Sequence, residues 1–314
     1  MSLKDAFKKQ GGTKLLKQYS KGGALFTCIC QFLLLGRSRT ALEILRLSGT
    51  LKIKQKLNRK YKWKLEEFDN SYIEKAHKSS DIIWMCWFQG IDNAPALVKK
   101  CYESVVKNNP DKEVIIITSN NINDYVTFPD YIVSKWKQGI ITHTHMTDLL
   151  RLELLITYGG VWLDATVLCT GKAPDYFFDS DLFFYQTLKP GRDGLASYIS
   201  SWMIEAKTNN KILMATKELC YEYWKDNNIM WDYFLLHDFM SIVLDKYEED
   251  WGKIVPRDNA TPHILLLRLF HQYDEKMWNA IKDQTQFHKL SYKFEKQKIE
   301  KKGTYYDVLI GENQ

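Results

Sequence analysis

Three charged residues, Asp148, Arg151 and Asp164, lie within a span of seventeen residues in a mostly apolar stretch, 147–167. The pattern of this stretch is typical of a buried helix, a two-glycine turn and a buried strand. Burying an unpaired charge costs several kcal/mol, so charges in such elements must be paired with one another or with a ligand. The stretch therefore predicts a polar site that is built into the core.

The elements of this stretch determine how its polar side chains are arranged. Asp148 and Arg151 are three residues apart and share one helix face, with Asp148 in the first turn, so a local ion pair is one interpretation. Side chains alternate along a strand, which places Asp164 and Thr166 on the same side near its end. The two glycines before the strand supply a tight turn, because glycine accepts backbone angles that other residues avoid.

The segment before this stretch predicts a parallel sheet. Residues 81–88 form an apolar strand, 95–106 have helical periodicity, and 113–118 form a continuous apolar strand of the kind that is buried on both faces. A strand, a helix and a strand make a βαβ unit. Ligands bind beyond the carboxyl ends of such strands, where Phe88 and Gln89 lie. Further strands are expected at 181–185, at 200–204 and, as a short edge strand, at 305–310, with helices at 131–136, 212–225 and from 231 onward, and a surface loop at 189–194.

The charge of the chain is unevenly distributed. Residues 1–64 contain sixteen Lys or Arg and two acidic residues, whereas the other 250 residues are acidic overall. This division predicts a basic helical arm, 1–64, and a main domain, 65–314. The apolar run 24–35 is shorter than the ~20 residues that span a bilayer. With its basic flanks it resembles an interfacial anchor on anionic lipid, although a helical pair packed on the main domain explains it equally well. No nucleic-acid recognition motif accompanies the charge.

The cysteines and histidines do not predict a metal site. The six cysteines form no C-x-x-C pair, and several lie in apolar runs, which is typical of a protein in a reducing compartment. His143 and His145 precede the central helix without a third ligand nearby. The polar N-terminus does not resemble a signal peptide, so a cytoplasmic location is expected.

The combination of Asp-x-x-Arg with Tyr-Gly-Gly-Val-Trp-Leu-Asp-Ala-Thr-Val resembles the donor-binding core of GT-A glycosyltransferases that carry a DXD motif. The resemblance is to glycosyltransferase family 32 and its bacterial capsular polysaccharide synthesis branch, and it covers roughly residues 80–170, including Ile-Trp-Met-Cys-Trp-Phe-Gln-Gly of the first strand. It implies a GT-A-type, Rossmann-like α/β fold, in which a mixed, mostly parallel sheet is flanked by helices. It also implies that Phe88 and Gln89 bind the donor.

The resemblance assigns roles to the central stretch. Asp148, Arg151 and Asp164 align with donor-binding residues, and Asp164 aligns with the first, catalytic Asp of the DXD motif, which binds sugar, ribose or metal. Thr166 replaces the second Asp, a metal ligand. A hydroxyl is a weak neutral ligand, whereas Mg²⁺ and Mn²⁺ prefer carboxylates. The expected cofactor is Mn²⁺ or Mg²⁺, and Thr166 makes tight metal binding doubtful.

Three residues of the C-terminal half complete the expected site. Asp238 is the candidate catalytic residue that orients the acceptor hydroxyl, and a helix-surface charge is the alternative. By resemblance, His288 is expected to bind the metal and Lys289 the donor diphosphate. The departing diphosphate gains negative charge, which a cation must stabilise.

The resemblance implies transfer of a hexose from a nucleotide sugar, expected to be UDP-linked, to a hydroxyl of a saccharide, with retention of configuration. The expected acceptor is a lipid-linked oligosaccharide of bacterial capsule or exopolysaccharide synthesis, at the inner face of the plasma membrane. Two alternatives remain. One is a membrane-associated module that binds carbohydrate or nucleotide without catalysis. The other is a glycoside hydrolase that uses Asp148 and Asp164 as its two carboxylates.

Overall fold

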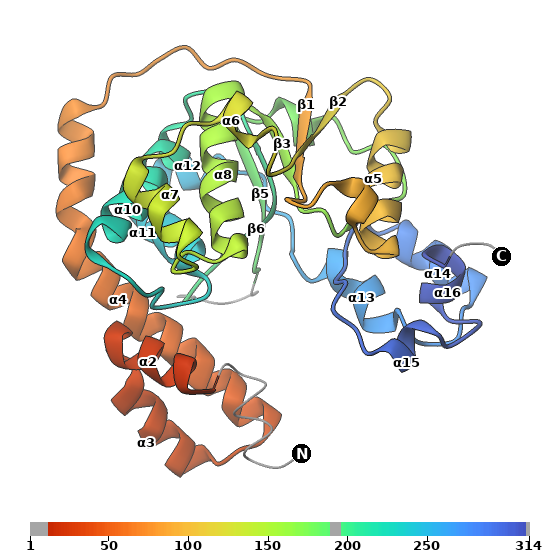
Figure 1. Cartoon of the computed structure of the whole chain (residues 1–314), viewed down its shortest axis with the longest axis horizontal. Coiled ribbons are helices and arrows are strands. Elements are labelled where there is room, and N and C mark those ends of the chain that lie inside the picture. Colours follow the sequence, from red (N-terminus) through yellow and green to blue (C-terminus); the bar gives the residue numbers. More distant parts are fainter. Residues whose placement is uncertain (1–11, 189–195, 312–314) are drawn as a thin grey trace.

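A five-stranded sheet forms the centre of the molecule (Figure 1). The computed structural model describes residues 12–188 and 196–311. The strands of the sheet are, in chain order, β1 (Ile82–Cys86), β2 (Glu113–Ile117), β3 (Gly160–Leu163), β5 (Leu182–Gln186) and β6 (Ile199–Ala206). Their order across the sheet is β2-β1-β3-β6-β5. β1 is parallel to β2 and β3, and β6 is antiparallel to β3 and β5. β6 therefore runs against the other four strands, which confirms a mixed, mostly parallel sheet.

The first two strands form the predicted βαβ unit. They are joined through α5 (Ala96–Asn108), and Ile82 to Cys86 pair in register with Glu113 to Ile117. The buried residues of α5 are Leu97, Val98, Cys101 and Val105. β2 is an edge strand whose residues 114–116 are only half-buried. The expectation that 113–118 is buried on both faces was therefore wrong, because at the edge of the sheet the apolar clusters on the two faces cover residues 114–116 only in part.

Separate apolar clusters cover the two faces of the sheet, because neighbouring side chains on a strand point to opposite faces. Trp84 and Trp162 point to one side, and Ile83 and Val161 point to the other. The helices on the side of the tryptophans are α4 (Arg39–Ser71), α6 (Ile122–Tyr125), α7 (Asp130–Lys137), α8 (His143–Tyr158), α10 (Lys211–Asp226) and α11 (Leu235–Lys246). On the other side lie α5 and α9 (Tyr176–Asp179).

A two-stranded sheet joins the central sheet to a C-terminal lobe, residues 261–311. It consists of β4 (Val167–Cys169) and β7 (Phe287–Lys289), which are antiparallel, with Val167 opposite Lys289. The lobe contains η2 (Thr261–His263), α13 (Ile264–Arg268), α14 (Glu275–Lys282), α15 (Lys296–Ile299) and α16 (Tyr305–Leu309), and it lies beside α5 (Figure 1). The single strand expected after the two glycines is divided into β3 and β4 by a turn. In this turn the amide of Val167 donates to the carbonyl of Asp164 (3.0 Å).

Residues 305–310 form the helix α16 and not the expected edge strand. The hydroxyl of Thr304 accepts a hydrogen bond from the amide of Asp307 (3.2 Å), the interaction of an N-cap residue. The expected loop at 189–194 lies outside the described residues. All six cysteines are free thiols. The remaining short helices are η1 (Ile91–Asn93) and α12 (Glu248–Trp251).

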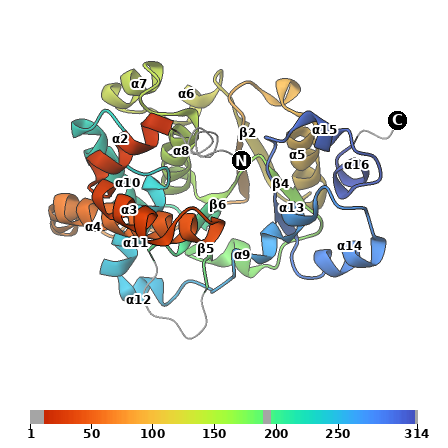
Figure 2. The ribbon, with the colours of Figure 1, turned by 90° about the horizontal axis from the view of Figure 1, so that it is seen from below.

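The N-terminal hairpin, residues 12–51, projects at the bottom of Figure 1 and is separate from the C-terminal lobe in both views (Figures 1 and 2). It contains α2 (Gly12–Gly22), α3 (Leu25–Leu35) and the first part of α4, and both α2 and α3 contact α4. The second part of α4 packs on α10 and α11. Because α4 runs without a break past residue 64, the division into 1–64 and 65–314 stays a prediction. Within the described residues, every helix is too short or too polar to cross a membrane.

Candidate functional site

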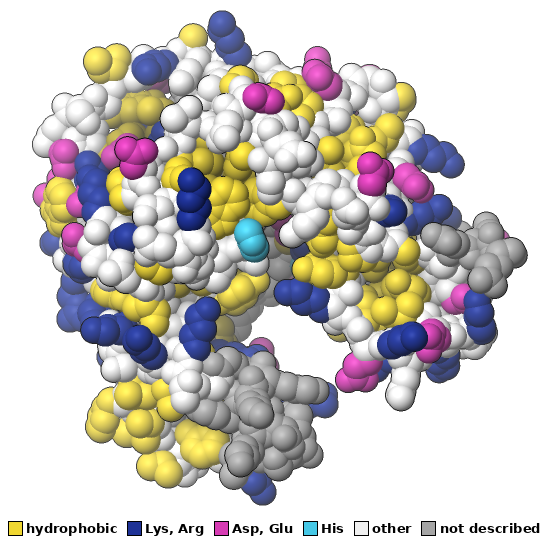
Figure 3. Space-filling model, in the orientation of Figure 1, with side chains coloured by type: hydrophobic (Ala, Val, Ile, Leu, Met, Phe, Trp, Pro, Cys, Tyr) yellow, Lys and Arg dark blue, Asp and Glu magenta, His cyan; other side chains and the backbone are white. Residues whose placement is uncertain are grey.

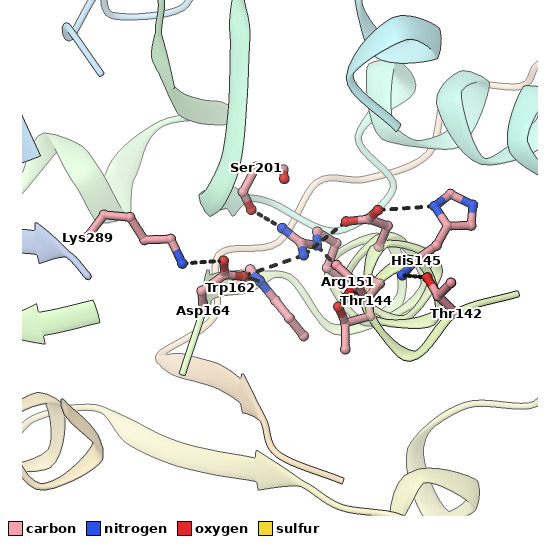
Figure 4. A network of polar contacts seen from close by, with 10 residues as sticks. Thr142, Thr144, His145, Arg151, Trp162, Asp164, Ser201 and Lys289 are labelled. Atoms are coloured by element: carbon pink, nitrogen blue, oxygen red, sulfur yellow. Dashed lines mark hydrogen bonds and ion pairs between the residues drawn. The ribbon is translucent and has the colours of Figure 1, made fainter. Parts of the chain in front are cut away.

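A chain of buried polar contacts runs along the helix α8 to the end of β3 (Figure 4). The indole of Trp224 donates to Nε2 of His145 (2.9 Å), and Nδ1 of His145 lies 3.1 Å from Oδ2 of Asp148. Because Nε2 accepts, a neutral His145 carries its proton on Nδ1 and donates it to the carboxylate. Oδ1 of Asp148 in turn lies 3.0 Å from Nη2 of Arg151. The helix thus fixes the carboxylate of Asp148 from two sides.

Arg151 connects this chain to the strand. Its Nη2 lies 3.5 Å from Oδ1 of Asp164, its Nη1 donates to the carbonyl of Ser201, and its guanidinium lies 4.8 Å from the ring centroid of Trp162. A buried guanidinium needs such partners, because removing one partner of a buried ion pair leaves an uncompensated charge. Arg151 therefore connects α8 to the end of β3 through Asp164, in addition to its local ion pair with Asp148.

Asp164 is the accessible end of the network. Its side chain is 27% exposed, against 9% for Asp148 and 4% for Arg151. Oδ1 accepts from the indole of Trp162 (3.0 Å), and Oδ2 accepts from Nζ of Lys289 (2.8 Å). Burial raises the pKa of Asp164, but Lys289 and Arg151 outweigh it and hold the pKa below its ordinary value. Asp164 is therefore a carboxylate at neutral pH, and it can accept hydrogen bonds from ligand hydroxyls.

Lys289 reaches this carboxylate from the C-terminal lobe (Figure 4). Its Nζ donates to Oδ2 of Asp164 and to Oγ1 of Thr166 (2.7 Å). The pairing of β7 with β4 positions it, and the amide of Leu290 donates to the carbonyl of Thr166 (2.9 Å). Asp164 and Thr166 face the same group, as expected, although a turn and not a continuous strand places them there.

The glycine turn before β3 sets the position of this strand. Gly159 and Gly160 have φ angles of 69° and 92°. A Cβ on Gly160 would lie 2.3 Å from the carbonyl oxygen of Ile82, so β3 approaches β1 as closely as only glycine permits. The indole of Trp84 donates to the carbonyl of Gly159 (2.9 Å). The amino end of β3 is therefore held against the amino end of β1, and the parallel register of the two strands carries β3 toward the edge where Asp164 lies.

Phe88 and Gln89 follow β1 at this same edge of the sheet. Phe88 is buried, with ring centroids 5.1 Å from Trp136 and 5.5 Å from His143 at the start of α8. Gln89 is exposed, and its carbonyl accepts from the side chain of Asn93 (2.9 Å). Both lie where a ligand above the strand ends would lie, and their contact with the donor stays a prediction.

The structure does not join Asp238 to the network. Its side chain is fully buried, and its two carboxylate oxygens have no hydrogen-bond partner within the described residues. Burial raises its pKa well above the ordinary value, Asp232 raises it further, and Lys54 opposes the shift. The alternative of a helix-surface charge was therefore wrong, and the acceptor role stays a prediction.

The neighbouring residue, His237, is half-buried, its ring centroid lies 5.1 Å from that of Phe234, and its Nδ1 has no hydrogen-bond partner within the described residues. Burial lowers the pKa of His237 to about 4, while the charges of Asp148, Arg151 and Asp164 also act on it. The same three charges act on Tyr233, just before α11. The sequence shows His237 as a polar residue in an apolar helix, and the prediction chose the adjacent acid, Asp238, and gave His237 no role.

His288 does not approach Asp164. Adjacent residues on a strand point to opposite sides, so His288 and Lys289 diverge. Nε2 of His288 lies 3.1 Å from Oγ1 of Thr170, and its ring centroid lies 5.4 Å from that of Trp278. Burial lowers the pKa of His288 to about 4.

The residues present do not fit the expected Mn²⁺ or Mg²⁺. The oxygens of Asp164 and Thr166 already hold an ammonium group, and the expected third ligand, His288, points away. Among residues 12–188 and 196–311, no group of three or more His, Cys, Asp or Glu side chains is placed to hold a metal ion. What the arrangement offers a ligand is one accessible carboxylate beside one accessible cation.

The chain is similar to proteins whose names refer to polysaccharide synthesis or glycosyl transfer. The sequence model of a family described as capsular polysaccharide synthesis protein matches residues 42–309. The O-glycosyltransferase braB of Annulohypoxylon truncatum is 32% identical over 160 residues, which are 45% of this chain and 37% of that protein. The O-glycosyltransferase PaGT of Phomopsis amygdali is 24% identical over 172 residues, which are 49% of this chain and 41% of that protein.

The chain spans less than half the length of these two curated relatives. A solved structure, the PaToxG glycosyltransferase, aligns with 85% of this chain and 98% of its own, at 16% identity and a TM-score of 0.39.

Proposed function

This chain belongs to the capsular polysaccharide synthesis protein family, and from that premise we propose that it is a glycosyltransferase that uses a nucleotide sugar. The observation that carries the proposal is the network of Asp148, Arg151, Asp164 and Lys289 at the carboxyl end of β3. In open α/β sheets, ligands bind outside the carboxyl ends of the strands. Asp164 and Lys289 present opposite charges there, as a sugar linked to a diphosphate requires.

The proposed donor is a UDP-linked hexose. The carboxylate of Asp164 accepts hydrogen bonds from sugar hydroxyls, and Arg151 and Asp148 hold it in place. The ammonium of Lys289 lies on the other side of this carboxylate and receives the diphosphate. Charge-assisted hydrogen bonds to phosphate and carboxylate are about twice as strong as neutral ones, so this pair orients the donor.

The proposed reaction retains the configuration of the sugar, as in the resembling family 32 enzymes of GT-A fold. The acceptor oxygen bonds to the anomeric carbon on the face from which the diphosphate oxygen departs, and its proton passes to that oxygen. This step needs no nucleophile from the protein. Asp164 positions the sugar in this scheme, and its low pKa keeps it ionised.

Glycoside hydrolysis is less compatible with the geometry. It needs two carboxyl groups that flank one bond, one of which is protonated. Here Asp148 and Asp164 both bind the guanidinium of Arg151, and Asp148 is nearly buried. A carboxylate held by a buried guanidinium is a poor general acid.

The proposed acceptor is a saccharide, and more specifically a lipid-linked oligosaccharide at the cytoplasmic face of a bacterial membrane. The exposed apolar face of α3 supports this location. Its most exposed side chains are Phe26 (79%), Leu33 (77%) and Leu34 (82%). Residues 12–42 contain five Lys or Arg and no acidic residue. Apolar side chains beside basic ones match the interface of an anionic membrane.

A screen of nucleotide sugars for protein-dependent release of UDP or GDP tests the proposed function. We expect release from one UDP-sugar, and a loss of roughly 100-fold or more in Asp164→Asn, the scale for removing a preorganised electrostatic contact. Asp283→Asn, an exposed site at the end of α14, is the matched control. Turnover of folded Asp164→Asn at the wild-type rate would contradict the assignment.

A further inference from the structure

The ammonium group of Lys289 donates to Oδ2 of Asp164 (Figure 4) and to Oγ1 of Thr166, the two side chains at the positions of the expected DXD motif. We propose that Lys289 serves as the built-in cation of the donor site, so that the diphosphate of the donor is bound and neutralised without a metal ion. This inference rests on the proposed function, because it concerns how that same site holds a nucleoside diphosphate.

The contacts of Lys289 leave it one donor for a ligand. An ammonium group has three N–H donors. One points to Oδ2 of Asp164 at 2.8 Å and one to Oγ1 of Thr166 at 2.7 Å, and no further partner of Lys289 is found within the described residues. The side chain is 18% exposed. The third N–H is therefore available to an oxygen of a bound diphosphate.

The charges around the site disfavour a divalent cation. Asp148 and Asp164 contribute two negative charges, and Arg151 and Lys289 contribute two positive ones. A metal ion between Asp164 and Thr166 would have to displace Lys289, and it would gain one carboxylate and one neutral hydroxyl. Mg²⁺ and Mn²⁺ prefer several anionic oxygens, which this pair does not supply.

The fold holds Lys289 in place. It lies on β7, where it is opposite Val167 of β4, and the adjacent Leu290 amide donates to the carbonyl of Thr166. The same strand directs His288 to the other side, toward Thr170 and Trp278. Because β7 is hydrogen-bonded to β4, the ammonium group of Lys289 is positioned before a ligand binds. Such preorganisation is the condition for strong electrostatic stabilisation of a leaving group.

The first experiment measures binding of UDP and of UDP-sugars to the full chain by calorimetry, in EDTA and in Mn²⁺. We expect the wild type to bind with the same affinity in both, and Lys289→Met to bind roughly 10- to 100-fold more weakly, the loss for one charge-assisted hydrogen bond. Met keeps the length of the side chain without its charge. Lys276→Met, at an exposed position on α14, should bind as the wild type does.

The second experiment measures Mn²⁺ binding directly by the electron paramagnetic resonance signal of the free ion. We expect the wild type to leave that signal unchanged. The double variant Thr166→Asp with Lys289→Ala should bind Mn²⁺, because it replaces the ammonium with a second carboxylate. This gain would be seen whether or not the variant is active.

The outcomes separate this proposal from the proposed function. Wild-type binding of UDP only in Mn²⁺, or Lys289→Met binding as tightly as the wild type in EDTA, would overturn the role of Lys289 and leave glycosyl transfer standing. Failure to bind any nucleotide or nucleotide sugar in either condition would overturn the donor site itself, and the role of Lys289 with it.

Discussion

At the scale of single residues, Asp238 is an ionisable side chain in an unfavourable environment. It is fully buried in α11, and neither carboxylate oxygen has a hydrogen-bond partner within the described residues. Burial raises its pKa well above the ordinary value. Between its unfolded and its folded pKa, the folded state binds more protons than the unfolded state. The free energy of unfolding therefore falls as the pH rises from the unfolded pKa toward the folded one.

Replacing this carboxyl group should remove that dependence. We expect Asp238→Asn to be more stable than the wild type at pH 8 by about 1–3 kcal/mol, because the amide cannot ionise and only the wild type must keep a proton on this buried group at that pH, and to lose the advantage near pH 4. Denaturant unfolding at several pH values measures this. Asp283→Asn, at an exposed carboxyl, is the control. Parallel pH profiles for wild type and Asp238→Asn would contradict the account.

The same variant tests the acceptor role that the sequence predicts for Asp238. If Asp238 only destabilises the core, its replacement should leave glycosyl transfer unchanged. If it orients the acceptor hydroxyl, its replacement should impair transfer. A raised KM for the acceptor in folded Asp238→Asn would therefore support the acceptor role, and an unchanged KM would contradict it. The charges of Asp148, Arg151 and Asp164 act on the pKa of the neighbouring His237 and not on that of Asp238.

The part of the site near the glycine turn was predictable from the cost of burying charge, whereas Lys289 was expected only by resemblance and its contact with Asp164 was not predicted. Asp148, Arg151 and Asp164 are charges in buried elements, so their mutual pairing follows from the cost of burial alone. The partner of Asp164, Lys289, lies 125 residues further along the chain, and only the pairing of β4 with β7 brings it there. Neither strand is long enough to have a clear period, so this contact depends on tertiary structure.

At the scale of elements, the approach of β3 to β1 decides where the site lies. Gly160 has φ 92°, and a Cβ there would lie 2.3 Å from the carbonyl oxygen of Ile82. This oxygen belongs to the backbone of β1 and cannot rotate away. Any side chain at Gly160 must push β3 from β1, and Asp164 moves with β3. The turn is therefore as important for the site as the charged residues that it positions.

Gly160→Ala should lower both stability and activity. Its matched control is Gly139→Ala, which has φ 71° and nothing within 4 Å of the added Cβ. We expect about 1–2 kcal/mol of destabilisation in Gly139→Ala from the backbone angle alone, and about 1–3 kcal/mol more in Gly160→Ala from overpacking. Only Gly160→Ala should lose transfer. Equal unfolding free energies in the two variants would contradict the close approach.

The helices and strands show which sequence patterns predict secondary structure correctly. The βαβ unit and the helices α8 and α10 follow from long apolar periodicities and were predicted correctly. The error at 305–310 concerned a run of only six residues, where a strand and a helix have the same apolar content. There the hydroxyl of Thr304, an N-cap, was the better signal.

At the scale of the whole molecule, the polar network and the apolar face of α3 lie in different parts of the structure (Figures 1 and 3). The exposed side chains of α3 and of the first part of α4 gather at the lower left of Figure 3. The second part of α4 packs on α10 and α11, and the amide of Gln18 in α2 donates to the carbonyl of Met230 (2.9 Å). The hairpin is therefore packed against the main body, so a membrane that binds it also restricts the orientation of the active site.

Removing the apolar face should release the protein from membranes without unfolding it. Phe26, Leu33 and Leu34 together bury little within the chain, so replacing all three with Ser should change stability by less than about 1.5 kcal/mol. On a bilayer, each fully buried side chain contributes about 1.5–3 kcal/mol, so the triple variant should bind vesicles roughly 100-fold or more weakly. Sedimentation with vesicles that contain phosphatidylglycerol measures this difference.

The control for this variant is a second triple replacement with Ser, at Leu267, Met277 and Val308, which are exposed apolar residues of the C-terminal lobe. It should bind vesicles as the wild type does, because it leaves the hairpin intact. Salt should weaken wild-type binding, since the lysines and arginines around α3 attract anionic lipid, and vesicles without that lipid should bind less. If both triple variants bind vesicles equally well, or if the wild type does not bind vesicles, α3 does not contact the membrane. Transfer to a soluble acceptor should survive in the α3 variant, because the network at the end of β3 does not include the hairpin.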